Sequence, residues 1–231
     1  VGNLLALPGP TGPAKPRGSN MVPGLSPPTE GDIIFDGQNL VGVDSHRITR
    51  SGVARTFQNI RLFQNLTVLD NVRVAYHTHA GYSMPEAVLR LGRFRRQERS
   101  LTEQAQDLLA VFGLQDRQLE VAKNLPYGEQ RRLEIARALA AQPRLLLLDE
   151  PAAGMNPTEA ESLMELTHFI RDRFNLTIVL IEHQMRVVMG ICEWITVMDF
   201  GQVIARGTAR EIQSDEKVIE AYLGKRSMRG P

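Results

Sequence analysis

The sequence predicts an α/β fold built on a parallel sheet, with an inserted, mostly helical subdomain. Two uninterrupted apolar runs, Leu145 to Leu148 and Ile178 to Ile181, have the length and composition of strands that are buried on both faces of a sheet. Amphipathic helical patterns come before and after these runs, and this alternation is typical of parallel sheets. With 231 residues, 42% of them hydrophobic, the chain is long enough to bury a sizeable core.

Composition excludes several broad functions. There are 27 Lys and Arg against 26 Asp and Glu, so the net charge of +1 supplies no overall attraction for nucleic acid. Cys192 is the single cysteine, which excludes an internal disulfide and a multi-thiolate metal site and fits a reducing compartment. The longest apolar runs are far shorter than the roughly 18 residues that cross a bilayer, so we expect any membrane role to depend on partners. The start at Val1 suggests that preceding sequence is missing.

The amino-terminal half contains one predicted hairpin and one predicted helical region. The first 30 residues are rich in Gly and Pro, which alone is typical of a linker. Asp32 to Phe35 nevertheless predicts a strand that enters a tight turn at Asp36-Gly37, because this dipeptide tolerates the positive φ values of a hairpin turn. From Met84 to about Leu114 the apolar residues follow a helical period, which predicts the helical subdomain.

The carboxyl-terminal half predicts helices and strands in alternation. A helix is expected over Glu129 to Ala141, followed by the strand at Leu145 and, further on, the strand Thr177 to Ile181. Between these strands, Asn156-Pro157-Thr158-Glu159 has the order of an N-cap, a first-turn proline and a capping-box glutamate. Two further elements are expected after these strands: a hairpin of Ile195 to Met198 and Val203 to Ala205 joined around Gly201, and a final amphipathic helix over Ala209 to Leu223.

Two carboxylates follow the first apolar strand directly. Ligands of parallel sheets bind beyond the carboxyl ends of the strands, where Asp149 and Glu150 lie in the sequence. In a nucleotide hydrolase the first carboxylate would hold Mg²⁺ and the second would orient or deprotonate the attacking water. The alternative is a buried strand whose exit is only solvated by acids.

A second segment, Leu125 to Arg137, places Gly128 directly before a predicted helix. Such an arrangement points backbone N–H groups and the positive end of the helix dipole at an approaching phosphate. A charged amphipathic helix after a glycine turn is also a common structural feature, so this segment alone leaves both interpretations open.

The order of the motifs resembles that of the ATP-binding subunit of ABC transporters, in particular the branched-chain amino acid importer type. The similarity extends from about Gly2 to Leu223. The segments that carry it are Arg55-Thr-Phe-Gln58-Asn59, which is similar to the Q-loop; Leu125 to Gln130, similar to the signature in its Tyr-Gly form; Leu145 to Glu150, similar to Walker B; Ala153 to Pro157, similar to the D-loop; and Ile181-Glu182-His183, similar to the switch histidine.

The resemblance implies ATP hydrolysis with ATP and Mg²⁺ as cofactors. Asp149 would hold Mg²⁺, and Glu150 would be the base. Gln58 would approach Mg²⁺ and the attacking water, so it is expected to be both a catalytic residue and a metal ligand, and the segment after it would touch the membrane subunit. His183 would contact the γ-phosphate.

Two further groups of residues would bind the nucleotide. In the phosphate loop these are Gly9, Gly12 and Lys15, with Lys15 on the β- and γ-phosphates. In the signature, the residues that would face the ATP held by a second subunit are Tyr127, Gly128, Glu129 and Gln130.

The resemblance also implies an organisation and partners. Residues 1–60 and 142–231 would form a RecA-like P-loop NTPase core of the ABC ATPase type, with its first strands missing, and residues 61–141 the α-helical subdomain with the signature. Two ATPase subunits would close head to tail on transmembrane permease subunits, at the cytoplasmic face of the bacterial inner membrane, and would serve a substrate-binding protein indirectly. Nucleic acid is not an expected partner. The permease and the binding protein would choose the transported substrate.

The phosphate loop departs from the family pattern. Ala14 stands in place of the second glycine and Pro16 in place of the hydroxyl residue that binds Mg²⁺, while Pro13 and Pro16 remove backbone N–H groups. One explanation is a degenerate nucleotide-binding partner with little ATPase activity of its own. Another is a compensated frameshift, since codons for Ala-Gly-Lys-Thr-Thr read one base later can encode Pro-Ala-Lys-Pro-Arg, the sequence of Pro13 to Arg17. A third reading, a soluble ABC-type ATPase that acts on DNA or ribosomes, is disfavoured because the chain has neither tandem cassettes nor long insertions.

Overall fold

A computed structural model describes residues 4–6, 20–79, 81, 84–89 and 92–223. The chain divides into two compact units, and each is considered by itself. The sheet unit comprises residues 1–58 and 144–231, and the helical unit comprises residues 59–143.

The sheet unit contains a six-stranded sheet in the order β4-β5-β6-β1-β7-β8. Its strands are β1 (Leu4–Ala6), β4 (Val53–Arg55), β5 (Leu145–Asp149), β6 (Thr177–Ile181), β7 (Trp194–Asp199) and β8 (Gln202–Gly207). All neighbours are parallel except β7 and β8. The prediction of a parallel sheet is therefore confirmed. Because Asp149 pairs with Ile181, strands β5 and β6 end at the same level of the same edge.

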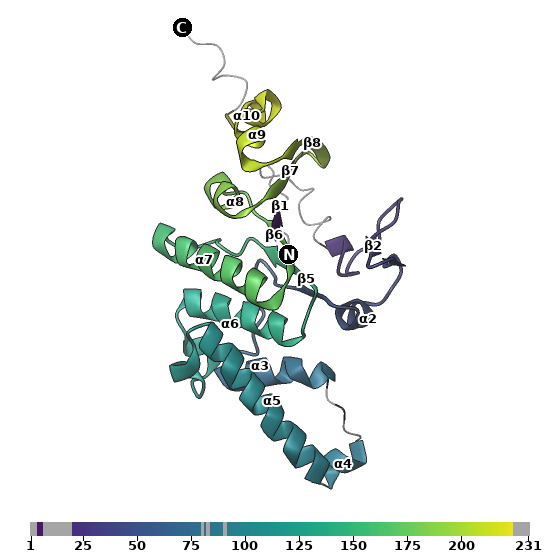
Figure 1. Cartoon of the computed structure of the whole chain (residues 1–231), viewed down its shortest axis with the longest axis vertical. Helices are drawn as coiled ribbons and strands as arrows, with labels where there is room; N and C mark the ends of the chain where they lie inside the picture. Colours follow the sequence, from purple (N-terminus) through teal and green to yellow (C-terminus); the bar gives the residue numbers. More distant parts are fainter. Residues whose placement is uncertain (1–3, 7–19, 80, 82–83, 90–91, 224–231) are drawn as a thin grey trace. The chain divides into compact units, whose positions relative to one another are not determined.

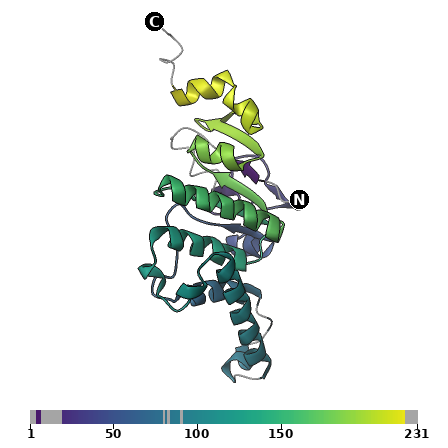
Figure 2. The same ribbon diagram turned by 60° about the vertical axis from the view of Figure 1, so that its left-hand side comes forward.

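Helices α7 (Pro157–Phe174) and α8 (Met185–Ile191) connect β5 to β6 and β6 to β7, as the alternating pattern predicts. Helix α2 (Ser45–Arg50) precedes β4, and helices α9 (Ala209–Gln213) and α10 (Glu216–Leu223) follow β8. Figure 2 shows α7 and α8 in green beside one another, and they are in contact. The predicted capping box of α7 is confirmed: the Asn156 side chain accepts from the backbone of Glu159 at 2.9 Å, and Glu159 accepts from the backbone of Asn156 at 3.0 Å.

The prediction of one continuous helix over Ala209 to Leu223 is wrong. The segment forms α9 and α10, which are separated by Ser214 and Asp215. The Asp215 carboxylate accepts hydrogen bonds from the backbone N–H groups of Lys217 at 2.9 Å and Val218 at 3.1 Å. A side chain that bonds to the backbone in this way starts a new helix, so it interrupts a pattern whose apolar period continues through the break.

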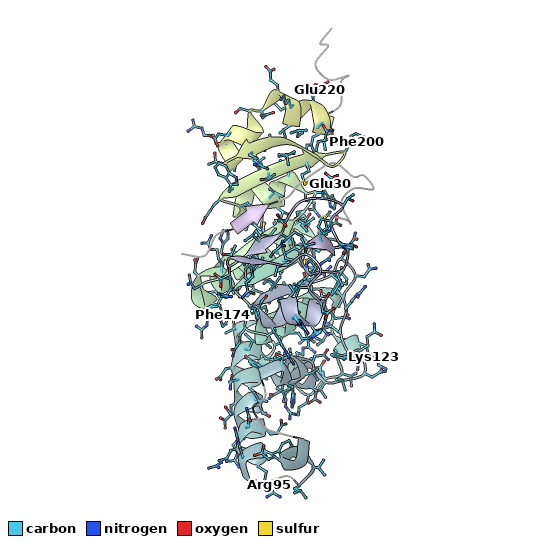
Figure 3. The ribbon with its side chains drawn as sticks, turned by 90° about the vertical axis from the view of Figure 1, so that its right-hand side faces the viewer. Glu30, Arg95, Lys123, Phe174, Phe200 and Glu220 are labelled. Carbon is cyan, nitrogen blue, oxygen red and sulfur yellow. The ribbon has the colours of Figure 1, made fainter. Side chains whose placement is uncertain are left out.

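Both predicted hairpins are present, and both turns use positive φ. Strands β2 (Ile34–Phe35) and β3 (Gln38–Asn39) are antiparallel, with φ of 50° at Asp36 and 76° at Gly37. Strands β7 and β8 are joined by Phe200 at φ 43° and Gly201 at φ 83°. Figure 3 shows Phe200 in this turn, where 87% of its surface is exposed. Two positive φ values match the mirror-image turns that fit the twist of hairpin strands.

The helical unit consists of helices and short 3₁₀ turns. They are α3 (Val68–Tyr76), η1 (His77–His79), α4 (Met84–Val88), α5 (Gly92–Val111), η2 (Gln115–Arg117), η3 (Ala122–Asn124) and α6 (Tyr127–Ala140). The expected helical region after Met84 therefore contains two helices, α4 and α5. Helix α3 packs on both α5 and α6, as Figure 1 shows, and buries Val68 and Val72 completely.

Cys192 is buried at the end of α8, with 6% of its surface exposed. Burial, with a smaller contribution from the Glu193 carboxylate, raises the pKa of its thiol to about 12. At pH 8 only about 10⁻⁴ of the thiol would be thiolate, so we expect no reaction with iodoacetamide in the native protein. Alkylation followed by mass spectrometry should label Cys192 only when urea unfolds the chain; rapid labelling without urea would contradict this prediction.

Candidate functional site

The carboxyl ends of three neighbouring strands, β4, β5 and β6, bring together the predicted catalytic residues of the sheet unit. Gln58 follows β4, Asp149 and Glu150 end β5, and His183 follows β6. The Gln58 side-chain amide donates to Glu150 Oε2 at 2.9 Å. His183 Nδ1 lies 3.6 Å from Glu150 Oε1. Glu150 therefore has an oxygen facing each of the other two side chains.

Glu150 adopts an unusual backbone conformation, with φ of 45°. A non-glycine residue in this left-handed region is strained, and such strain is concentrated at functional sites. Two hydrogen bonds hold the conformation: the Glu150 N–H donates to the carbonyl of Ile181 at 2.8 Å, and the Glu150 carbonyl accepts from Ala153 at 3.1 Å. The carboxylate is consequently fixed at the edge of the sheet, where 14% of the side chain is exposed.

Asp149 is paired with an arginine that sequence reasoning did not identify as a site residue. Arg55, the last residue of β4, donates from Nη2 to Asp149 Oδ2 at 2.6 Å and from Nη1 to Asn20 Oδ1 at 2.7 Å. The two charged side chains are 8% and 13% exposed. Arg55 thus links the segment at Asn20 to the carboxylate at the end of β5.

Removing the cation from this pair should destabilise the fold. Arg55→Met would leave the Asp149 carboxylate almost buried without its counter-charge, so we expect a loss of about 3 kcal/mol in the free energy of unfolding by urea. Arg186→Met is the matched control, because its pair with Glu161 is 79% and 57% exposed and should be worth less than about 1 kcal/mol. Equal losses in the two variants would contradict this prediction.

Glu182 is the second residue that the sequence did not single out. It is fully buried, and its carboxylate accepts from three backbone N–H groups: Ala152 at 3.2 Å, His183 at 3.0 Å and Gln184 at 3.3 Å. The first belongs to the loop after Glu150 and the others to the loop after β6. Glu182 therefore ties together the loops that carry Glu150 and His183. Glu182 directly follows the apolar strand β6, and the sequence pattern supplies no signal for this role.

The buried Nδ1 atom of His183 has no hydrogen-bond partner within the described part of the chain. It lies 3.6 Å from the Glu150 carboxylate and 3.7 Å from the Glu182 carboxylate, and 38% of the side chain is exposed. Because Nδ1 is enclosed beside these two carboxylates, the exposure of the ring lies at its other atoms, which a group that approaches the edge of the sheet would meet.

The same edge is compatible with a magnesium ion. Among the described residues, no cluster of three or more His, Cys, Asp or Glu could hold a metal by itself. Mg²⁺ does not need one, because it usually takes one or two carboxylates and completes its coordination with water and phosphate oxygens. Asp149 Oδ2 is occupied by Arg55, while no partner for its other oxygen is found among the described residues. One carboxylate oxygen at this edge can thus be a ligand.

The signature residues lie at the amino end of α6 in the helical unit. The sequence predicts that Gly128 lies directly before the helix. The helix instead begins at Tyr127, so Gly128 lies within its first turn. The Gln130 side chain donates to the carbonyl of Leu125 at 2.8 Å, and Glu129 lies 3.6 Å from Arg117. First-turn N–H groups point out of the amino end of a helix and can meet an anion there.

The predicted phosphate-loop residues Gly9, Gly12 and Lys15 lie outside the described residues. The structure thus brings together Gln58, Asp149, Glu150 and His183 in the sheet unit, and Tyr127 to Gln130 in the helical unit.

Comparison with known proteins identifies the family. The family description "ABC transporter" matches residues 1–153, and "Branched-chain amino acid ATP-binding cassette transporter" matches residues 202–227. The chain is 41% identical over 222 residues to the high-affinity branched-chain amino acid transport ATP-binding protein BraF of Pseudomonas aeruginosa, and 42% identical over the same length to LivG of Escherichia coli K12. Each alignment covers 96% of this chain and 87% of the relative.

Less similar relatives include a protein of a different transport system and a protein of known structure. The lipopolysaccharide export system ATP-binding protein LptB of Escherichia coli K12 is 32% identical over 97% of this chain and 87% of its own length. The crystal structure of MJ1267 in its ADP conformation, an ATP-binding cassette of an ABC transporter, superposes with a TM-score of 0.80 at 27% identity and covers 97% of this chain and 88% of that chain. The family match over most of the chain, the identity to full-length relatives and the fold agree, and the chain belongs to the ABC transporter family of ATP-binding cassettes.

Proposed function

We propose that this chain is the ATP-binding and ATP-hydrolysing subunit of a membrane importer for branched-chain amino acids. The observation that carries the catalytic part is the meeting of Gln58, Glu150 and His183 at the ends of adjacent parallel strands. The RecA-like core corresponds to the sheet unit, and the helical subdomain with the signature corresponds to the helical unit.

In this proposal Glu150 accepts the proton of the attacking water. Its Oε2 accepts a hydrogen bond from the Gln58 side-chain NH₂ group, which holds the carboxylate in place. This bond does not use the Gln58 side-chain oxygen, which is the atom that would bind Mg²⁺. His183, supported by the backbone contacts of Glu182, contacts the γ-phosphate. ATP is bound with Mg²⁺, which neutralises charge on the phosphates, and Asp149 and Gln58 are the residues that would hold the ion.

The remaining nucleotide contacts come from two segments. Gly9, Gly12 and Lys15 bind the phosphates of the same chain's ATP. The residues from Tyr127 to Gln130 face the ATP of a second ATPase subunit in a head-to-tail dimer, as the position of the first turn of α6 allows.

The transported substrate and the membrane partners follow from the relatives. BraF and LivG are named as branched-chain amino acid transport proteins, and the match over residues 202–227 carries the same description. The described residues include no helix that is long and apolar enough to cross a bilayer. By analogy with these relatives, we place the chain at the cytoplasmic face of the bacterial inner membrane, on transmembrane permease subunits that receive substrate from a binding protein.

The deciding experiment measures ATP binding and hydrolysis by the full chain, alone and with its membrane subunits, with Mg²⁺ or with EDTA. The proposal predicts Mg²⁺-dependent hydrolysis that increases when the membrane subunits and a leucine-loaded binding protein are present. Absence of nucleotide binding would instead favour the degenerate partner, for which Pro13 and Pro16 in the phosphate loop are the motivating observation. Sequencing the coding DNA from Gly9 to Gly24 separates a specialised loop from a frameshift.

A further inference from the structure

A buried ion pair connects the signature end of α6 to the segment that follows Gln58. Arg131 Nη1 donates to Glu134 Oε2 at 2.8 Å, and the two side chains are 0% and 2% exposed. The other oxygen, Glu134 Oε1, accepts the backbone N–H of Arg61 at 3.1 Å. At the opposite end, Arg131 Nη2 donates to the Tyr127 hydroxyl at 3.3 Å. All of these residues belong to the helical unit.

The segment after Gln58 is held to the helical unit at several points. Glu134 holds Arg61, and the fully buried Asn71 of α3 holds Phe63: Asn71 Oδ1 accepts from the Phe63 N–H at 2.9 Å, and Asn71 Nδ2 donates to the Phe63 carbonyl at 3.1 Å. The Arg137 guanidinium stacks on the Phe63 ring, 5.4 Å from its centroid. The Phe63 side chain itself remains 48% exposed.

These contacts come from one face of α6. Tyr127, Arg131 and Glu134 are spaced by four and three residues, which places them on one side of a helix. Leu133, Ala136 and Ala140 lie on the other side, and they are buried as well. A charged i, i+3 pair on a helix is usually a solvated surface feature of little energetic value. This pair is buried, and it makes two further hydrogen bonds, from Arg131 to the Tyr127 hydroxyl and from the Arg61 N–H to Glu134.

We propose that Arg131 and Glu134 are positioning residues that couple the first turn of α6 to the backbone of the segment Arg61 to Phe63. This inference rests on the proposed function, in which the first turn of α6 faces a partner's ATP, and on the family resemblance, which implies that the segment after Gln58 touches the membrane subunit. The chain of hydrogen bonds Tyr127–Arg131–Glu134–Arg61 then transmits a displacement of the signature residues to the backbone of that segment. The ion pair acts through its geometry, and neither residue touches the reacting groups.

The test needs a variant that removes this connection and retains the packing. Arg131→Met with Glu134→Leu replaces a buried ion pair by apolar side chains of similar size, which usually preserves stability. Neither new side chain can accept a hydrogen bond from the Arg61 backbone N–H. The matched control is Glu98→Gln, which weakens the half-buried pair of Glu98 with Arg73 in the same unit without touching Arg61.

Hydrogen exchange at single-amide resolution reads the connection directly, on the full chain without nucleotide. In the double variant the Arg61 amide should exchange at least about tenfold faster, whereas the Phe63 amide, held by Asn71, should stay within about twofold of wild type. Unchanged exchange at Arg61, or equal acceleration throughout α3 and α6, overturns the proposal. If the double variant does not fold, Glu134→Gln gives the same test, because a neutral amide oxygen is a weaker acceptor than a carboxylate.

Coupling is then measured in vesicles that hold the membrane subunits, as leucine transported per ATP hydrolysed. We expect this ratio to fall at least about fivefold in the double variant, with the melting temperature and the nucleotide affinity unchanged. A purely structural role would leave the ratio unchanged in a variant that melts like wild type. If the wild-type chain itself neither hydrolyses ATP nor pairs with membrane subunits, the proposed function fails, and the exchange experiment still decides whether the connection exists.

Discussion

Glu150→Gln is expected to lower the rate of ATP hydrolysis by about 10²–10⁴-fold, the range that a positioned general base contributes. The substitution keeps the shape of the side chain and lets its oxygen still accept the Gln58 amide hydrogen bond. It removes the basic oxygen beside His183 Nδ1, and with it the group that would take the proton of the attacking water. ATP affinity should remain within about twofold, because the phosphate contacts are made elsewhere.

The measurement is steady-state phosphate release together with equilibrium binding of ATP to the same protein. Glu193→Gln is the matched control. This exposed carboxyl precedes β7, at the amino ends of the parallel strands, and pairs with Arg171. Its variant should hydrolyse ATP at the wild-type rate. A Glu150 variant with near-normal hydrolysis would remove Glu150 from the role of base; a wild-type chain that binds ATP without hydrolysing it would favour the degenerate partner.

The sequence predicts the parts of the sheet whose residues are apolar throughout. Strands β5 and β6, of five residues each, contain continuous apolar runs, and their short length and composition favour strands that are covered on both faces. Strand β4 is only three residues long and ends in Arg55, so periodicity cannot show that it lies next to β5. The contact between Gln58 and Glu150 depends on that adjacency, and only the resemblance to a family led to the expectation that they act together.

Buried polar residues are the part of the site that sequence patterns do not reveal. Arg131 and Glu134 have the spacing of an exposed pair, and the apolar stripe of α6 lies on the other side, yet both are enclosed. The reason is tertiary: Glu134 Oε1 accepts a backbone N–H, and Arg131 Nη2 donates to a tyrosine hydroxyl. The break between α9 and α10 has a similar origin, since one Asp215 carboxylate bonds to the backbone and overrides the apolar period.

In the sheet unit, Glu182 is another buried polar residue that the sequence pattern does not reveal, and its removal is expected to have a large effect on stability. Glu182→Leu should lower the free energy of unfolding by at least about 3 kcal/mol, because the N–H groups of Ala152, His183 and Gln184 lose their acceptor. At 0% exposure there is little room for water to replace it. The loss should be visible as a shift of the urea unfolding midpoint.

The same variant should also hydrolyse ATP at least about tenfold more slowly under conditions in which it is fully folded, because the loops that carry Glu150 and His183 are no longer tied together. Glu165→Leu, on the exposed face of α7, is the control for introducing a leucine and should change stability by no more than about 0.5 kcal/mol. A Glu182 variant as stable as this control would show that the three hydrogen bonds contribute little. A destabilised variant with normal hydrolysis would limit Glu182 to a structural role, because the position of His183 would then not depend on the buried carboxylate.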